Sequence, residues 1–315
     1  MTPPRLAIIV PCYNEQEALP DTIKVLGALR ARMAADGLIS PDSYLLFVDD
    51  CSADNTWQII IEAHSIDASV RGVTLMANAG QQPAMLCGME TAAKDADCVV
   101  TIDADLQDDP EAIVSMVEKF RSGADIVYGV RASRDSDTWF KRNTARMFYR
   151  VQRLFGVKVI YDHSEFRLMS RRAIEMLCCY DERNLFLRGV VQSLGLPSAI
   201  VYFDRKARTA GTTKYNFGKL LSLSIDGVTS FTSRPMRMIF VLGIAIVFLD
   251  IIVGIWALTS YITHKSVTGW TSLILSVWLL GGLILMSLGI VGEYIGKIFL
   301  EVKHRPRFHV REYIK

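Results

Sequence analysis

The chain has 315 residues, half of them apolar, and its formal net charge at pH 7 is only +2. This near-neutral balance argues against nucleic-acid binding as the main function. The six cysteines form no CxxC pair and no zinc-type spacing with histidine, so we expect small core residues in a reducing compartment.

Short apolar runs alternate with amphipathic stretches through the first half of the chain. Asn14 and Glu17 resemble a capping box at the start of the first amphipathic stretch. The alternation predicts a parallel, doubly wound α/β sheet, in which ligands bind beyond the carboxyl ends of the strands. We predict strands at residues 6–11, 44–49, 72–77, 98–103 and 125–130, with helices at 15–35, 55–68, 82–94 and 111–122.

Polar side chains follow the predicted strands at this one edge of the sheet. Carboxylates and an arginine gathered there indicate a site for an anionic ligand held together with a metal ion. The glycine-rich signatures GxGxxG and GxxxxGK[ST] are missing from the expected places, so metal and side chains are expected to hold the phosphates. The strand-end residues are Tyr13, Asn14 and Glu15, then Asp49 and Asp50, residues 78–82, residues 103–107, and Arg131.

The fourth predicted strand ends in two carboxylates and an amide. Asp103 and Asp105 are spaced i, i+2, so on an extended chain they face a common point, with Gln107 following in register. Two carboxylates and an amide oxygen suit Mg²⁺ or Mn²⁺. A simpler interpretation is that Asp108 or Asp109 only caps the next helix, but capping does not account for Asp103.

Residues 131–215 are richer in basic and aromatic side chains. We predict a helix at 138–155 whose arginines either form a solvated face or contact a ligand, a helix from Ser170, and a strand near 199–203. Residues 204–215 form a basic loop with glycine and threonine, the composition of a mobile, phosphate-seeking segment. Residues 216–237 are moderately amphipathic and are predicted to form a juxtamembrane helix, either in the membrane interface or packed on soluble protein.

Two apolar segments, 238–261 and 271–296, are each long enough to cross a bilayer. Basic residues flank both segments and are sparse between them, which places both flanks in the cytoplasm. Residues 1–6 lack the apolar stretch of a signal peptide, so we expect the soluble part to stay in the cytoplasm. Asp250 within the first span suggests a polar partner, and the spacing of Gly292 and Gly296 suggests helix packing between protomers of a homo-oligomer.

Five motifs in this order carry a resemblance to a known family: VPCYNE, VDDCSADNT, DADLQDDP, FRLMS and GTTKY. They resemble family 2 glycosyltransferases with the GT-A fold, and among these the polyprenyl-phosphate glycosyltransferases related to dolichyl-phosphate mannose synthase. The likeness is greatest to the bacterial undecaprenyl-phosphate (bactoprenol) glucosyltransferase and aminoarabinosyltransferase type, which has two C-terminal membrane helices. The end of the second span, LGIVGEYIGKIFLEVK, fits this type.

The resemblance implies a GT-A domain at 1–215, the juxtamembrane helix, the two transmembrane helices, and a cytoplasmic basic tail at 297–315. It also implies a set of residues that bind the nucleotide sugar and the metal ion on its diphosphate. These residues are Pro11, Tyr13, Glu15, Val48, Asp50, Asp103, Ala104, Asp105 and Gln107. Within this set, Asp50 reads the base or ribose, and Asp103, Asp105 and Gln107 hold Mg²⁺ or Mn²⁺.

The same resemblance implies phosphate binding by Arg131 and closure of Arg208 and Lys214 on donor and acceptor phosphates. Glu165 stands where many relatives carry an aspartate that is sometimes proposed as the catalytic base. Cys51 stands where the family usually has glycine, so the turn there is expected to differ slightly. We interpret Glu165 as a positioning or electrostatic group, because a phosphate nucleophile is already largely ionised at neutral pH.

The implied reaction is an inverting transfer of a hexose, glucose as the first choice, from a UDP- or GDP-linked sugar to polyprenyl phosphate. It would serve cell-envelope glycan or lipopolysaccharide modification, with the enzyme multi-pass in the bacterial inner membrane and both termini cytoplasmic. A processive polysaccharide synthase usually has a Gln-x-x-Arg-Trp motif, and no tryptophan here follows an arginine. A non-catalytic membrane scaffold is the remaining alternative, against which the complete motif set argues.

Overall fold

The computed structural model describes residues 2–131, 163–182, 187–204 and 269–315, together with scattered positions between 236 and 255. The described residues belong to two compact units. The first contains the described residues up to 204 and the C-terminal residues 305–315. The second contains residues 269–304 and the scattered positions. Each unit is described by itself.

The first unit is built on a central sheet whose middle strands are parallel and buried on both faces. These are β1 (Leu6–Cys12), β2 (Tyr44–Asp49), β3 (Val70–Leu75) and β4 (Cys98–Thr101). β1 lies between β2 and β4, and β3 pairs with the far side of β2. Continuous apolar runs produce this arrangement, because a strand covered by helices on both sides has no polar face.

The full sheet has eight strands in the order β7-β5-β6-β4-β1-β2-β3-β8. β5 (Ile126–Arg131) and β7 (Ser198–Phe203) run parallel to each other. β6 (His163–Ser170) is antiparallel to both β4 and β5, and β8 (Val310–Ile314) is antiparallel to β3. The expectation of an all-parallel sheet is therefore wrong, and the sheet is mixed.

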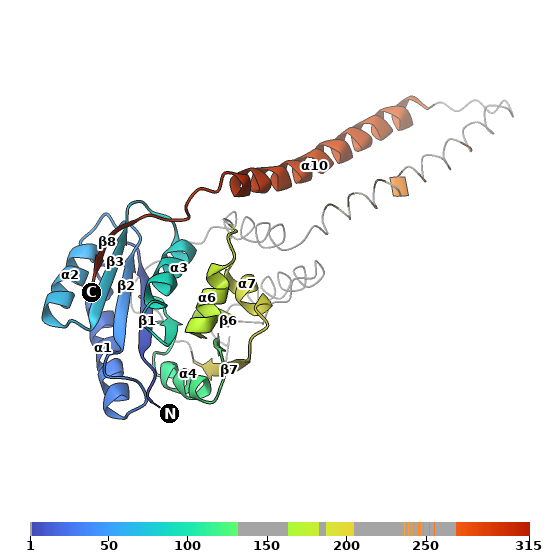
Figure 1. Cartoon of the computed structure of the whole chain (residues 1–315). Helices are drawn as coiled ribbons and strands as arrows, with labels where there is room; N and C mark the ends of the chain where they lie inside the picture. The colour runs from blue at the N-terminus through green and yellow to red at the C-terminus, as the bar shows by residue number, and fades with distance from the viewer. Residues whose placement is uncertain are drawn as a thin grey trace. The chain divides into compact units, whose positions relative to one another are not determined.

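Helices cover both faces of this sheet (Figure 1), which confirms the α/β class. α1 (Leu19–Ala35), α2 (Thr56–Ile66) and α4 (Ala112–Arg121) share one apolar core with the sheet. α3 (Gln81–Ala92) packs on β1 and β2 and contacts α6 (Arg171–Cys178). α3 comes close to the sheet at Gly88, where a Cβ would lie 2.6 Å from Ile9. α7 (Leu187–Ser193) precedes β7.

Two predicted element boundaries differ from the structure. α1 begins at Leu19, with Ala18 as an N-cap that makes no side-chain bond, so the capping box at Asn14 and Glu17 is wrong. The Asn14 side chain instead accepts a hydrogen bond from the Ala53 amide at 2.8 Å. The helix from Ser170 is confirmed, and the Ser170 hydroxyl caps it by accepting from the Ala173 amide at 3.1 Å.

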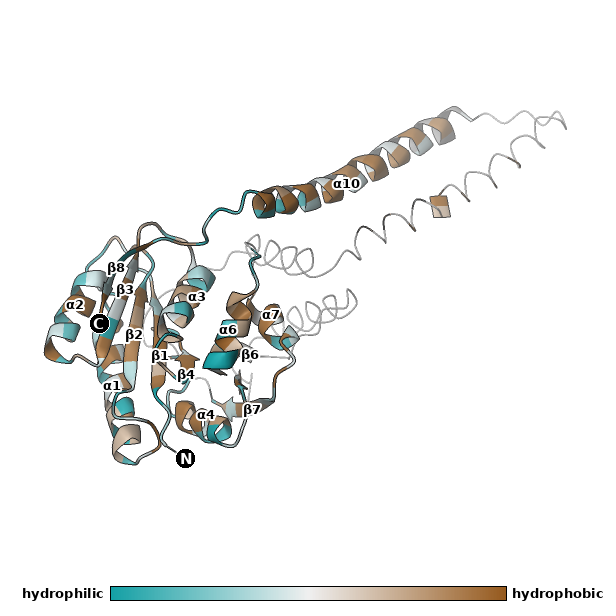
Figure 2. Cartoon of the chain, in the orientation of Figure 1, coloured by the Kyte–Doolittle hydropathy of each residue, from teal (hydrophilic) through white to brown (hydrophobic). Residues whose placement is uncertain are grey.

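The second unit is described chiefly by α10 (Trp270–Val302). Within it, Leu279–Val302 is long and apolar enough to cross a membrane, since 24 residues of helix span about 36 Å. Figure 2 shows α10 apolar along most of its length, whereas the helices around the sheet mix polar and apolar residues. α10 covers the predicted 271–296 span. The predicted first span at 238–261, with Asp250, and the 216–237 helix lie outside the continuously described residues.

The turn after β2 has the backbone shape that glycine favours. Cys51 has φ +57°, the left-handed region that costs a residue with a Cβ roughly 1–2 kcal/mol. Cys51 therefore occupies a conformation that glycine would adopt without this cost. The expectation that the turn differs slightly from that of the family stays a prediction.

Replacing Cys51 with glycine is expected to raise the free energy of unfolding by about 1 kcal/mol, because the Cβ strain disappears. Thermal unfolding of the purified protein measures this change. Cys51→Ala is the matched control: it removes the thiol but keeps the Cβ, so it should bring no gain. Equal stabilisation by both variants would contradict the explanation.

Candidate active site

The carboxyl end of β1 is joined to the end of β2 by hydrogen bonds between their loops. The Asn14 amide donates to the Ser52 hydroxyl at 3.0 Å, and the Glu15 amide donates to the Thr56 hydroxyl at 2.9 Å. Tyr13 is left half exposed at this edge. The loop after β1 is therefore held in place through its backbone, while its aromatic side chain stays accessible.

Asp50 connects β2 to the loop that follows β3. Its two carboxylate oxygens accept hydrogen bonds from the Ala79 and Gly80 amides at 2.7 and 2.8 Å. Burial raises the pKa of Asp50, and these two amide donors oppose the rise. Gly80, at φ +96°, takes a conformation that an L residue with a Cβ rarely adopts. Asp50 thus shapes the loop from which α3 begins.

The loop that carries the two predicted metal ligands lies beyond the end of β4, because the strand stops at Thr101. A turn therefore places Asp103 and Asp105. The sequence had suggested instead that the alternation of side chains along an extended strand would place them. The Thr22 hydroxyl of α1 donates to the Ala104 carbonyl at 2.6 Å, and the Gln107 amide donates to the Asp105 carboxylate at 3.2 Å.

Negative charge accumulates around Asp103. Burial raises its pKa to about 7, with further contributions from Asp105, Asp108 and Glu165, while Arg131 lowers it. These groups come from the β4 loop, β5 and β6, so the structure brings five charged side chains near enough to interact electrostatically. The Gln81 side-chain amide, at the start of α3, donates to Asp103 at 2.8 Å.

Asp108 does not cap a helix. Its carboxylate, 3% exposed, accepts from Arg131 Nε at 3.1 Å and from Nη2 at 3.0 Å, while the N-cap of α4 is Glu111. The predicted phosphate-binding Arg131 is therefore already paired with a carboxylate, and it lies next to the predicted metal ligands.

Glu165 is held by a buried arginine. Arg167, with no exposed surface, forms an ion pair with the Glu165 carboxylate, and the Thr101 hydroxyl donates to the Glu165 carbonyl at 2.5 Å. Sequence reasoning did not single out Arg167. The signal was present, because residues i and i+2 of a strand share a face.

The other predicted site residues differ in how far they can reach a ligand. Pro11 and Val48 are buried and adjacent across β1 and β2, so only their backbone can border a ligand. Arg208 and Lys214 lie outside the described residues. The assignments of individual residues to nucleotide, sugar or metal stay predictions.

Within the described part of the chain, no three His, Cys, Asp or Glu side chains are grouped closely enough to hold a metal ion by themselves. Asp103 and Asp105 offer two carboxylates, and Gln107 is a third residue of the same turn. Magnesium and manganese commonly use one or two protein carboxylates and complete their shell with water and substrate phosphates. A cation bound there would reduce the repulsion between the carboxylates around Asp103.

A mixed α/β sheet with helices on both faces and carboxylates at the carboxyl ends of its central strands is typical of enzymes that act on nucleotides or phosphates. Residues 7–195 match the family described as Glycosyl transferase family 2. The chain belongs to this family and is a glycosyltransferase, as the motifs predicted.

Curated relatives extend this likeness over nearly the whole chain. The Bacillus subtilis protein named uncharacterized glycosyltransferase YkoT is 47% identical, covering 98% of this chain and 91% of the relative. The bactoprenol glucosyl transferase of Shigella phage SfV is 34% identical, covering 98% of both chains. Among solved structures, mannosyl-3-phosphoglycerate synthase from Rubrobacter xylanophilus matches with a TM-score of 0.48 and 15% identity over 75% of each chain.

Asp103→Asn is expected to stabilise the metal-free protein at pH 8. The folded-state pKa of about 7 lies above the ordinary value of 3.8, so ionised Asp103 destabilises the fold increasingly as pH rises from about 4 to 7. The melting temperature of the variant should exceed that of the wild type by the largest margin above pH 7, and the margin should shrink as pH falls toward 4. A margin independent of pH would contradict this origin.

Arg167→Met is expected to destabilise the protein by about 3–5 kcal/mol, because it leaves the Glu165 charge buried without its partner. The double variant Glu165→Leu with Arg167→Met should recover most of that loss, since neither charge then remains. The free energies of unfolding of the wild type, the two single variants and the double variant together form a double-mutant cycle, which measures the coupling between the two residues. Simple additivity of the two single effects would show that the pair is not coupled.

Proposed function

We propose that this protein transfers a hexose, with glucose as the first choice, from a nucleotide-diphosphate sugar to polyprenyl monophosphate. The observation that carries the proposal is the 34% identity to a bactoprenol glucosyl transferase across 98% of both chains. The apolar helix α10 supports it further, because an enzyme whose acceptor is a membrane lipid needs to work at the bilayer surface.

The donor is proposed to bind at the carboxyl ends of β1, β2 and β4. Tyr13 and Asp50 would border the nucleoside, and Asp103, Asp105 and Gln107 would hold Mg²⁺ or Mn²⁺. Such an ion neutralises the charge that develops on a leaving diphosphate. Whether the donor carries uridine or guanosine is an outcome of the experiment below.

The reaction follows from the acceptor's own chemistry. An oxygen of the lipid phosphate attacks the anomeric carbon, the bond from that carbon to the donor diphosphate breaks, and the nucleoside diphosphate leaves with the electron pair. The second pKa of a phosphomonoester is about 6, so no strong base is required. Glu165, fixed by Arg167, then serves to position or to balance charge. Arg131, with Arg208 and Lys214, is proposed to bind phosphate.

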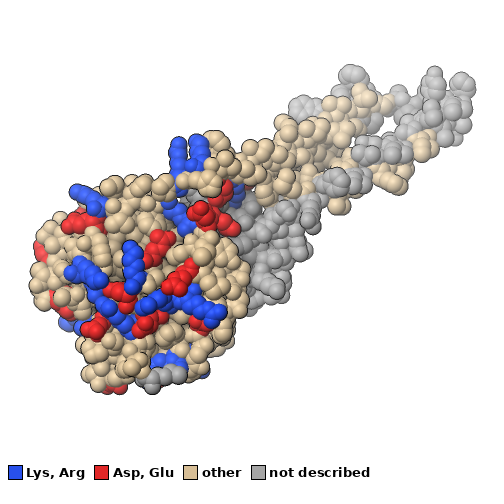
Figure 3. All heavy atoms as spheres, in the orientation of Figure 1, with Lys and Arg blue, Asp and Glu red and all other residues tan. Residues whose placement is uncertain are grey.

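The proposed setting is the cytoplasmic face of a bacterial inner membrane, with a multi-pass chain, both termini in the cytoplasm, and a product used to modify cell-envelope glycan or lipopolysaccharide. On the face of the sheet-containing unit seen in Figure 3, basic and acidic residues are intermixed. Such a surface fits a small-molecule donor better than a polyanionic polymer.

Purified full-length protein incubated with labelled UDP-glucose or GDP-mannose, undecaprenyl phosphate and Mn²⁺ should place label in an extractable sugar-phosphate lipid. Removal of the divalent ion should abolish transfer. Asp105→Asn should lower the rate roughly 100-fold, the loss typical of removing one group that stabilises charge in the transition state. Asp36→Asn, at the C-terminal end of α1, is the matched control and should behave as the wild type.

Two results would contradict the proposal. Label in a long polymer would identify a processive synthase instead. Absence of transfer with either donor, in protein that melts normally, would favour a non-catalytic scaffold.

A further inference from the structure

The C-terminal strand β8 closes the β3 edge of the sheet. The two strands pair from Leu75 opposite Val310 to Gly72 opposite Ile314. The Ile314 side chain packs against the apolar core, and Gly72 makes room for it, since a Cβ there would lie 3.1 Å from Ile314. β8 is therefore docked by both its backbone and a side chain.

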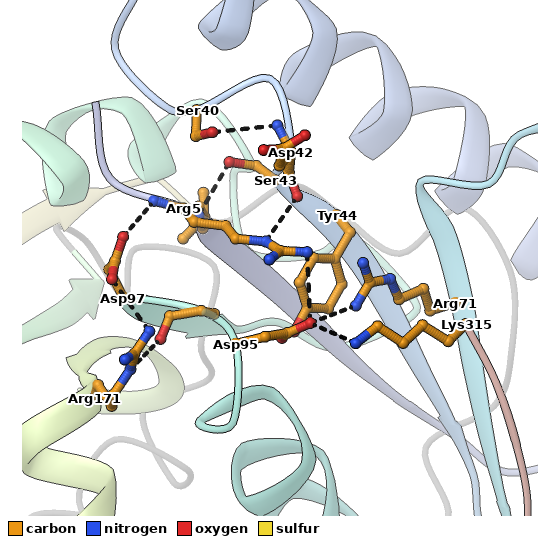
Figure 4. Close-up of polar contacts among 12 residues, drawn as sticks. Arg5, Ser40, Asp42, Ser43, Tyr44, Arg71, Asp95, Asp97, Arg171 and Lys315 are labelled. Atoms are coloured by element: carbon orange, nitrogen blue, oxygen red, sulfur yellow. Dashed lines mark hydrogen bonds and ion pairs between the residues drawn. The ribbon is translucent and has the colours of Figure 1, made fainter. Parts of the chain in front are cut away.

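One end of β8 is tied to an ionic cluster at the beginning of the parallel strands. Lys315 Nζ lies 3.1 Å from the Asp95 carboxylate, which also binds Arg71 at 2.9 Å, Arg5 at 3.4 Å and the Tyr44 hydroxyl at 2.5 Å (Figure 4). Burial alone would raise the pKa of Asp95, but these partners lower it to about 2. The last residue of the chain is thus joined to β1, β2 and β3 through one ionised carboxylate.

The other end of β8 is tied close to the candidate active site. The His309 carbonyl accepts a hydrogen bond from the Met76 amide at 2.8 Å. Arg307 donates to the carbonyls of Glu182, at 3.1 Å, and of Tyr180. The segment just before β8 therefore bridges the end of β3 and the loop after α6.

Met76 begins the loop that shapes the site. Further along this loop, the Ala79 and Gly80 amides donate to Asp50, and the Gln81 side-chain amide donates to Asp103. The Met76 side chain is 63% exposed, so packing does little to hold the start of this loop. Hydrogen bonds at its two ends, to His309 on one side and to Asp50 on the other, restrain it.

We propose that β8 is a positioning strand for the donor site: its pairing with β3, extended by the hydrogen bond from the Met76 amide to the His309 carbonyl, holds the 76–81 loop where Asp50 and Asp103 receive their hydrogen bonds. The role assigned to the donor rests on the proposed function, whereas the restraint on the loop does not. β8 acts through the loop and does not itself touch the reacting atoms.

Hydrogen exchange of the full-length protein, measured on a peptide covering residues 76–82, tests the restraint. Ile314→Asp places a charge against the core and should undock β8, so the Ala79 and Gly80 amides should exchange at least about tenfold faster. Arg311→Asp, which changes an exposed side chain of the same strand, is the matched control and should leave their exchange unchanged. Peptides from β1 report whether the fold is intact.

Lys315→Met provides a second test if Ile314→Asp does not fold. It removes the tether to Asp95 without placing a charge in the core, and it should accelerate exchange of the 76–82 peptide in the same direction. In a folded variant, the 310–314 amides can lose their protection while the 76–82 peptide still exchanges at the wild-type rate. That result would overturn the proposal.

Calorimetric titration with UDP or GDP in the presence of Mn²⁺ tests the consequence for the donor. Whichever nucleotide binds the wild type should bind the Ile314→Asp variant about tenfold more weakly. It should bind the Arg311→Asp variant with the affinity of the wild type. Unchanged affinity in a variant with a loosened loop would overturn the positioning role. If neither nucleotide binds the wild type, the proposed function fails, while the exchange result still decides the restraint on the loop.

Discussion

Negative charge crowded at the end of β4 is the constraint on which the rest of the candidate site depends. Burial of Asp103, together with the carboxylates around it, raises its pKa to about 7. Arg131 on β5 and the Gln81 amide on α3 offset part of this charge, and a buried arginine binds Glu165. A site with such a surplus of negative charge is suited to a cation and to the phosphates that a cation attracts.

Loops place most of the groups that would meet a ligand. Apart from Arg131 at the end of β5 and Glu165 on β6, these side chains follow the ends of the strands, and a few hydrogen bonds shape the connecting turns. Asp50 organises one turn through two amides, and Thr22 reaches from α1 to the Ala104 carbonyl in another. The sheet supplies a rigid frame, and these bonds transmit its rigidity to the site.

The sequence predicted those parts of the fold that depend on local apolar patterns. Strands β1 to β5 are nearly continuous apolar runs, and the polar residues that follow them lie at the carboxyl-end edge of the sheet, as expected. β6 was missed because Glu165 and Arg167 interrupt its apolar pattern, and only the fold shows that they neutralise each other inside the sheet. The pairing of Asp108 with Arg131 could likewise not be predicted, because it joins a residue of the loop after β4 to the last residue of β5. β8 was missed because its partner, β3, lies far from it in the sequence.

The return of the chain terminus to the sheet bears on how the enzyme can be divided for study. A soluble fragment ending at residue 215 would retain the family motifs but lose β8. The unpaired backbone of β3 would then become an open edge, and open edges recruit strands from other molecules. Asp95 would lose its lysine partner as well. Such a fragment would be prone to self-association. A short peptide carrying residues 305–315 would counteract this by pairing with the open edge of β3.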